Sequence, residues 1–164
     1  MAGKAEPRVM VVTAAENSCA SNVIFDVTAT DNCGVPNVVS VPPSGSTFPV
    51  GVTTVTNIAT DGSGNQATCT FTVTVADHEN PVVTCPSNLV LNADPGQCSQ
   101  SNVTFSVSAT DNCTVTNLVS VPASGSTFPV GVTTVTNTAT DASGNVSSCT
   151  FTVTILDTQN PVIT

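Results

Sequence analysis

Basic residues are nearly absent from this chain. Its 164 residues include two Lys or Arg against eleven Asp or Glu, which gives a formal net charge of −9. Nucleic-acid binding requires stripes of Lys and Arg, and anionic membrane surfaces attract basic clusters. We therefore expect no nucleic-acid partner and no attraction to an anionic membrane, whereas the acidic balance would attract cations.

Aromatic residues and long apolar runs are scarce as well. The chain has six Phe but no Trp and no Tyr, so Val must supply most of the core, and an exposed aromatic platform for carbohydrate is lacking. No apolar run approaches the roughly 18 residues of a transmembrane helix, so we predict no membrane insertion. The first residues lack the apolar stretch of a signal peptide, so a secreted form would have lost its signal or be a segment of a longer chain.

The residues needed for catalysis do not form any known pattern. His78 is the single histidine, and no G-x-S-x-G motif accompanies it. No glycine-rich loop opens a helix, which excludes that route to phosphate binding. We predict no catalytic residues and no enzyme.

A repeated segment organises the sequence. Residues 44–57, S-G-S-T-F-P-V-G-V-T-T-V-T-N, return letter for letter at 124–137. Two tandem domains follow, which we place at 1–79 and 80–158, with 159–164 as the start of a further repeat or an intersubunit strand. The junction, D-H-E-N-P, has no Gly/Ser-rich linker, so we expect a stiff pair.

Short alternating segments predict strands throughout. In the segment 22–30, Val23, Phe25 and Val27 alternate with polar residues, as in a half-buried strand. The strands expected in the first copy are 7–13, 22–30, 37–41, 47–48, 52–60 and 66–76. With no helix signal and about seven short strands per copy, the predicted fold class is all-β, with two tandem immunoglobulin-like β-sandwich domains.

Several motifs together resemble the hyalin repeat, an immunoglobulin-like extracellular module. They are N-P-V-V-T-C-P at 80–86, D-P-G-Q-C at 94–98, A-T-D-N-C at 29–33 and 109–113, and A-T-D-x-S-G-N at 59–65 and 139–145, beside the repeated F-P-V-G. The resemblance implies a secreted or cell-surface protein of adhesion, matrix or surface arrays. The chain departs from it at Asn57 and Asn137, where members often have cysteine, and at Glu6, which stands opposite Cys85.

Seven cysteines in a small chain indicate an oxidising, extracellular setting. In a sandwich of this type, the loop after the second strand and the final hairpin lie at the same pole. We therefore predict the disulfides Cys33–Cys69 and Cys113–Cys149, with Cys85–Cys98 as a third pair. Cys19 would remain single or bond to another chain, and the alternative is that some of these residues are free buried thiols.

Acidic residues gather around the junction and its nearest loops. We expect Asp77 and Glu79 to approach Asp111 and Asp141 in an interdomain site, with backbone carbonyls completing the six to eight oxygens that calcium requires. The alternative is that these residues serve only as turn and cap residues.

Three N-x-[ST] triplets begin at Asn102, Asn112 and Asn145 and are candidate glycosylation sites. Such triplets are common in Ser/Thr-rich chains, and Thr is also simply a good strand residue.

The last residues repeat the start of the second copy. Asn160, Pro161, Val162, Ile163 and Thr164 correspond to 80–84. They could join the sheet of a neighbouring molecule, dock end to end, or be cut from a longer array. We predict a structural building block of an extracellular fibre or surface array that assembles with copies of itself head to tail. The alternative is an adhesive or carbohydrate-binding accessory module of a larger secreted protein.

Overall fold

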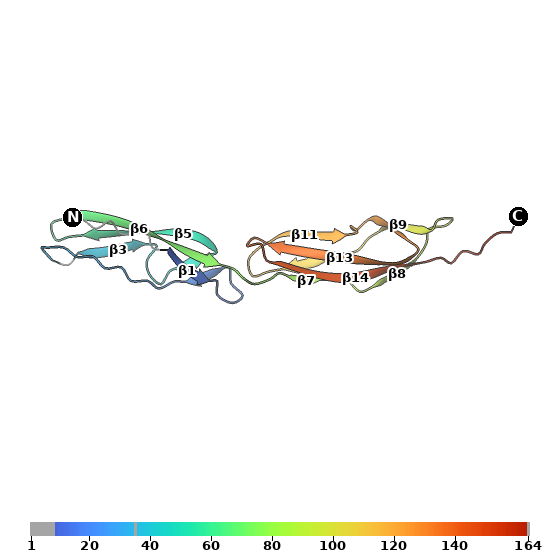
Figure 1. The fold of residues 1–164 in the computed structure, drawn as a ribbon, viewed down its shortest axis with the longest axis horizontal. Coiled ribbons are helices and arrows are strands. Elements are labelled where there is room, and N and C mark those ends of the chain that lie inside the picture. Colours follow the sequence, from blue (N-terminus) through green and yellow to red (C-terminus); the bar gives the residue numbers. More distant parts are fainter. Residues whose placement is uncertain (1–8, 35, 164) are drawn as a thin grey trace. The chain divides into compact units, whose positions relative to one another are not determined.

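The computed structural model describes residues 9–34 and 36–163, and these residues form strands and turns without a helix. The chain divides into two compact units, Met1–His78 and Glu79–Thr164 (Figure 1). Each unit contains its own buried apolar cluster between layers of strands. The all-β fold class of two tandem sandwiches is confirmed.

In unit 1 a four-stranded sheet faces a two-stranded pair. The order of the large sheet is β1-β6-β5-β3, in which β1 runs parallel to β6 and the other neighbours are antiparallel. The small pair is β2-β4. The strands are β1 Val9–Thr13, β2 Ala20–Asn22, β3 Asn37–Val41, β4 Thr47–Pro49, β5 Gly51–Thr60 and β6 Gln66–Ala76.

Unit 2 repeats this plan and adds one pair of strands. Its large sheet has the order β11-β13-β14-β8, and the opposite layer contains β12-β9 and β10-β7. Strand β8 is parallel to β14, as β1 is to β6. The strands are β7 Val82–Thr84, β8 Leu89–Asn92, β9 Ser99–Val103, β10 Ser108–Thr110, β11 Val115–Val121, β12 Ser126–Pro129, β13 Gly131–Asp141 and β14 Val146–Leu156.

The repeated segment builds the centre of both cores. Phe48 and Val55 are buried in unit 1, and Phe128 and Val135 are buried in unit 2. Between each buried pair the chain turns at a glycine with positive φ, 111° at Gly51, a conformation that side-chain-bearing residues rarely adopt. The identical letters therefore place an aromatic ring and a valine in the same core positions of each unit.

The strand expected at 22–30 is wrong as one continuous strand. Strand β2 ends at Asn22, and residues 23–30 form no ladder within the described part of unit 1. Phe25 is instead held by Ser44, whose hydroxyl accepts from the Phe25 N–H at 2.9 Å and donates to the Phe25 carbonyl at 2.7 Å. Of the expected strand 7–13, residues 7 and 8 lie outside the described residues.

Candidate functional site

One disulfide bridges the two layers of unit 2. Cys85 follows β7, and Cys149 lies on β14, where it alternates with the buried Phe151 and Val153 and so faces the core. The amide of Asn137 lies beside the bridge and donates to the Cys85 sulfur at 3.1 Å and to the Cys149 carbonyl at 3.4 Å. The bridge therefore ties β7 to the large sheet from inside the sandwich.

This bridge overturns the predicted cysteine pairs. Cys149 bonds to Cys85, so the pairs Cys113–Cys149 and Cys85–Cys98 are wrong, because Cys149 faces the core rather than the polar pole of the hairpin. Cys33 and Cys69 are exposed free thiols, so the predicted bond between them is also wrong, and Cys98 is a third exposed free thiol. Cys19, which we expected to remain single, is disulfide-bonded.

Unit 1 has an open groove on its inner face. Its volume is about 600 Å³, and it lies beside Phe25, Phe71 and the free thiol of Cys69. The remaining lining residues are Val9, Met10, Asp26, Val27, Thr28, Asn57 and Thr70. The sequence reasoning missed this groove, although Glu6 opposite Cys85 already indicated that the two copies differ here.

The side-chain carbonyl oxygens of the buried residues Asn57 and Asn137 differ in their hydrogen bonding. In unit 1 the Ser40 hydroxyl donates to the Asn57 carbonyl oxygen at 2.7 Å. In unit 2 no described residue donates a hydrogen bond to the carbonyl oxygen of Asn137, although Asn137 is fully buried. An unsatisfied buried oxygen destabilises the fold, so unit 2 carries a local cost that unit 1 avoids.

The hairpin aspartates organise their own turns. One oxygen of Asp141 accepts from the backbone N–H of Ser143 and of Asn145, and the other accepts from the Asn145 side chain, each at 2.8 Å. Burial raises the pKa of Asp141, but these hydrogen bonds outweigh it, and the net pKa lies below its ordinary value. Asp61 makes the same set of bonds with Ser63 and Asn65. The repetition favours turn formation as the role of Asp141.

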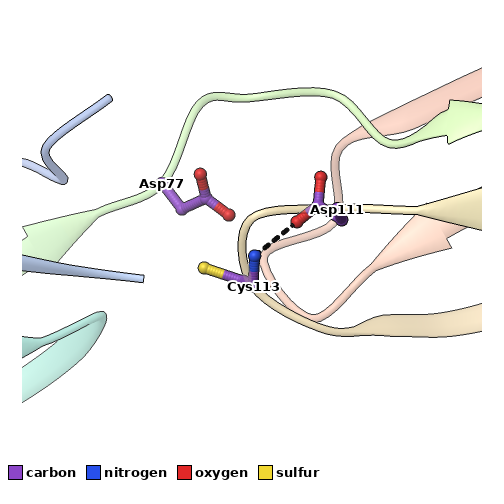
Figure 2. Close-up of side chains that lie close together, drawn as sticks. All are labelled: Asp77, Asp111 and Cys113. Atoms are coloured by element: carbon purple, nitrogen blue, oxygen red, sulfur yellow. Dashed lines mark hydrogen bonds between the residues drawn. The ribbon is translucent and has the colours of Figure 1, made fainter. Parts of the chain in front are cut away.

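Asp111 also supports a turn, since its carboxylate accepts from the backbone N–H of Cys113 at 2.8 Å (Figure 2). Asp31 accepts from Cys33 at 2.9 Å in the same way. Of the predicted calcium ligands, Asp77 belongs to unit 1, whereas Glu79, Asp111 and Asp141 belong to unit 2. Calcium binding by these four residues stays a prediction.

The three glycosylation candidates lie in different surroundings. Asn102 is exposed, whereas Asn112 and Asn145 are half-buried. The side-chain nitrogen of Asn145, to which a glycan would attach, already donates to Asp141. Asn102 is therefore the most accessible acceptor, and glycosylation itself stays a prediction.

The terminal segment exposes apolar side chains. Val162 is 86% exposed and Ile163 is 98% exposed, and neither belongs to a strand. Asn160 and Pro161 are exposed too, and Thr164 lies outside the described residues. Residues 160–163 are thus exposed, and Val162 and Ile163 are the most exposed apolar side chains among them.

A family model, the HYR domain, matches residues 6–75 and again residues 76–155. The chain belongs to the HYR domain family. The predicted hyalin-repeat resemblance is therefore confirmed for both copies.

Several curated proteins resemble these two HYR domains. The chain is 42% identical to hyalin of Strongylocentrotus purpuratus over 163 residues, which cover 94% of this chain and 14% of that protein. It is 42% identical to hyalin of Lytechinus variegatus, and the match covers 87% of this chain and 28% of that protein. It is 31% identical to the serine-rich adhesin for platelets of Staphylococcus aureus strain MRSA252, and the match covers 76% of this chain and 11% of that protein. The chain thus spans a minor part of each of these relatives.

Solved structures show a more distant likeness. The chain is 14% identical to human protocadherin-24 EC1-2, with a TM-score of 0.38 and 92% of this chain and 95% of that chain covered. Drosophila N-cadherin EC1-3 is 15% identical, with a TM-score of 0.35, and the match covers 95% of this chain and 66% of that chain. In the described part of the chain there is no helix that could span a membrane.

Proposed function

We propose that this pair of HYR domains is a non-enzymatic building block of an extracellular fibre or cell-surface array, in which copies associate head to tail. Membership of the HYR family and similarity to two hyalins support an extracellular, adhesion-related role. The disulfide Cys85–Cys149 supports an oxidising location, because such bonds are rare in reducing compartments.

The observation that carries this proposal is the second occurrence of the N-P-V motif, at residues 160–162. Residues 160–163 read N-P-V-I and repeat the N-P-V-V of residues 80–83 with one change. In unit 2 the earlier copy is packed, with Pro81 buried and Val83 half-buried, whereas Ile163 is almost fully exposed. The sequence of residues 160–163 thus matches a segment that packs within unit 2, which supports association of these residues with a further domain.

Electron microscopy of the purified chain at increasing protein concentration tests the proposal. We expect linear particles that lengthen with concentration, because a head-to-tail contact that does not close produces a filament. A variant with Ile163→Asp places a charge in the contact and should remain monomeric. Isolated monomers of the parent chain at high concentration would contradict the proposal.

The second candidate is an adhesive or ligand-binding accessory module of a larger secreted protein. The observation in its favour is that the chain spans 11% of a much longer relative that is named as an adhesin. Binding of the Ile163→Asp variant to glycan arrays and to cells separates the two functions. Specific binding by this variant would support the module, and its absence would support the structural role.

Calcium binding belongs to the proposal as a separate feature. Calcium takes six to eight oxygen ligands, and the predicted carboxylates are Asp77, Glu79, Asp111 and Asp141. If these residues bind the ion in the folded protein, calcium raises the melting temperature and a chelator reverses the rise. A melting temperature that stays constant under both treatments would contradict calcium binding by these residues.

A further inference from the structure

The large sheet of each unit turns a face without charged side chains to solvent. In unit 2 the buried Val135 and Phe151 mark the inward sides of β13 and β14, so the residues that alternate with them point outward. On β13 these are Val132 and then a threonine at every second position from 134 to 140. The four strands of this sheet contain one charged residue, Asp141, which is buried. We call the outward side chains of each large sheet its outer face.

Exposed valines occupy the same places on both outer faces. Val132 pairs with Thr154 in unit 2, and Val52 pairs with Thr74 in unit 1. Val132 is 70% exposed and Val52 is 69% exposed. Three further exposed valines occupy matching positions, Val90, Val119 and Val121 in unit 2 and Val11, Val39 and Val41 in unit 1. Solvent-facing strand positions usually carry polar side chains, so this repetition indicates a contact surface.

The acidic side chains lie off these faces. Among the described residues they occupy loops and turns, as Asp61, Asp94 and Asp157 do, apart from Asp141, the last residue of β13. Because the chain has a formal net charge of −9, two copies repel each other wherever these loops meet. The outer faces are therefore the surfaces on which two copies can approach without bringing carboxylates together.

The composition of the outer faces favours a second copy as the partner. None of the six Phe residues is exposed, so no aromatic side chain is available to stack on a sugar ring. A charged partner finds no opposite charge on these faces, whereas a second copy presents the same methyl and hydroxyl groups. From the spacing and rise of the strands, one outer face measures about 500 Å². Two faces in contact then bury about 1,000 Å², the lower end for a specific interface.

We propose that an outer face of one copy packs against an outer face of a second copy, sheet on sheet. Packed sheets lie about 10 Å apart, which lets the valines of the two faces interdigitate. The hydroxyls of Thr136 and Thr150 have no hydrogen-bond partner among the described residues, so they are available to donate and accept across the contact. This lateral contact goes beyond the head-to-tail contact of the proposed function. A single contact is weak, but contacts add up when copies are joined in a row.

Sedimentation equilibrium of the Ile163→Asp variant tests the lateral contact apart from the head-to-tail one. N-ethylmaleimide blocks the free thiols of Cys33, Cys69 and Cys98, so that no new disulfide links the copies. In dilute buffer the repulsion between loops should keep this variant monomeric. We expect its weight-average mass to rise above that of the monomer as NaCl is raised to about 1 M, because salt screens the loop carboxylates.

Matched variants in the same background locate the contact on the outer faces. Val52→Glu together with Val132→Glu would bury carboxylates in the contact, so association at high salt should weaken about tenfold or more. Ile24→Glu together with Val82→Glu adds the same charge at exposed residues outside the outer faces and should leave association intact. Circular dichroism checks that both variants keep the fold of the parent.

Charge reversal tests whether the two faces meet directly. A variant with Val52→Lys and Val132→Lys should associate with the Glu variant more strongly than either variant associates with itself, because opposite charges then face each other. Association of the Glu variant that equals that of its control would overturn this inference. Failure of the Lys and Glu variants to associate with each other would overturn it as well.

The remaining outcomes separate this inference from the proposed function. If the Ile163→Asp variant stays monomeric at every salt concentration while the parent chain forms linear particles, the lateral contact is overturned and the proposed function stands. If lateral association persists but the parent chain forms no linear particles, the proposed function alone is overturned. Glycans found by mass spectrometry on Thr134 or Thr136 of the secreted protein would also overturn the inference, because they would cover the outer face.

Discussion

Units 1 and 2 share a fourteen-residue segment but differ in how completely their cores are closed. In unit 2, Phe151 is 3% exposed and Cys149 is bonded, whereas in unit 1 Phe71 is half-buried and Cys69 is an exposed thiol. The two rings make the same edge-to-face contact with a preceding phenylalanine, at 5.0 Å for Phe25 and Phe71. The shared scaffold therefore does not by itself determine how far these rings are buried.

Between the two units, the largest difference in the free energy of unfolding is expected when Phe71 or Phe151 is replaced by alanine. Phe151→Ala removes a ring from a closed core and should lower the free energy of unfolding by about 3–5 kcal/mol. Phe71→Ala empties a site that already borders an open groove and should cost about half as much. Scanning calorimetry of the two variants beside the parent measures both losses, and equal losses would show that the two cores are closed alike.

The disulfide gives the next largest effect. Cys149→Ser removes a bridge between residues 64 positions apart and should lower the free energy of unfolding by about 2–4 kcal/mol. The matched variant Cys69→Ser should change it by less than about 0.5 kcal/mol, because its thiol is exposed. Denaturant unfolding without reductant checks this, and a large loss from Cys69→Ser would mean that Cys69 has a partner.

Alanine substitutions of the serines beside the buried asparagines should differ by a smaller amount in the free energy of unfolding. Ser40→Ala removes the donor to Asn57 and leaves a buried oxygen unpaired, at a cost of about 1–2 kcal/mol. Ser120 lies opposite Asn137 in the ladder, but the Asn137 oxygen has no hydrogen-bond partner, so Ser120→Ala should be nearly neutral. Denaturant midpoints of the two variants measure this difference in stability. The difference would disappear if the Ser120 hydroxyl donated a hydrogen bond to the Asn137 carbonyl oxygen in solution.

Acidification should produce the smallest effect, and a shared one. The pKa of Asp61 lies below its ordinary value of 3.8 because of hydrogen bonds from the Asn65 side chain and from backbone N–H groups. For Asp141, burial raises the pKa, but its hydrogen bonds outweigh this and lower it overall. A carboxylate with a lowered pKa stabilises the fold fully above its unfolded pKa and loses that contribution as the pH falls through the folded pKa.

Melting temperature should therefore remain level from about pH 7 to pH 5 with respect to these groups and fall below about pH 4. The double variant Asp61→Asn and Asp141→Asn should show a shallower fall. An unchanged acid profile in that variant would mean that the hairpin carboxylates do not control acid stability.

The scaffold could be predicted from the sequence because its signals are local. Alternation of apolar residues and the hairpin loops with Asp, Gly and Asn predict the long strands, and β3 and β6 occupy the ranges expected. The repeated letters placed Phe48 and Phe128 in equivalent positions, which are both buried. Such patterns depend on neighbouring residues along the chain, so they can be read without knowledge of the tertiary contacts.

The disulfide and the groove could not be predicted because they depend on which strand covers which face. The prediction for Cys149 follows from the expected position of the final hairpin at one pole of the sandwich, whereas its alternation with Phe151 and Val153 indicates an inward side chain. Residues 23–30 alternate in sequence as a strand does, yet they form no ladder with any other described residue, and no local pattern records this. The presence of Glu6 opposite Cys85 is a second signal in the sequence, because it shows that the two copies differ at this position.

Sedimentation velocity over a range of protein concentrations tests head-to-tail association most directly. We expect the parent chain to sediment faster as concentration rises, whereas a chain shortened to end at Gln159 should sediment as a monomer at every concentration. Equal sedimentation of the two chains would contradict the account, because association would then be absent or would not require residues 160–163.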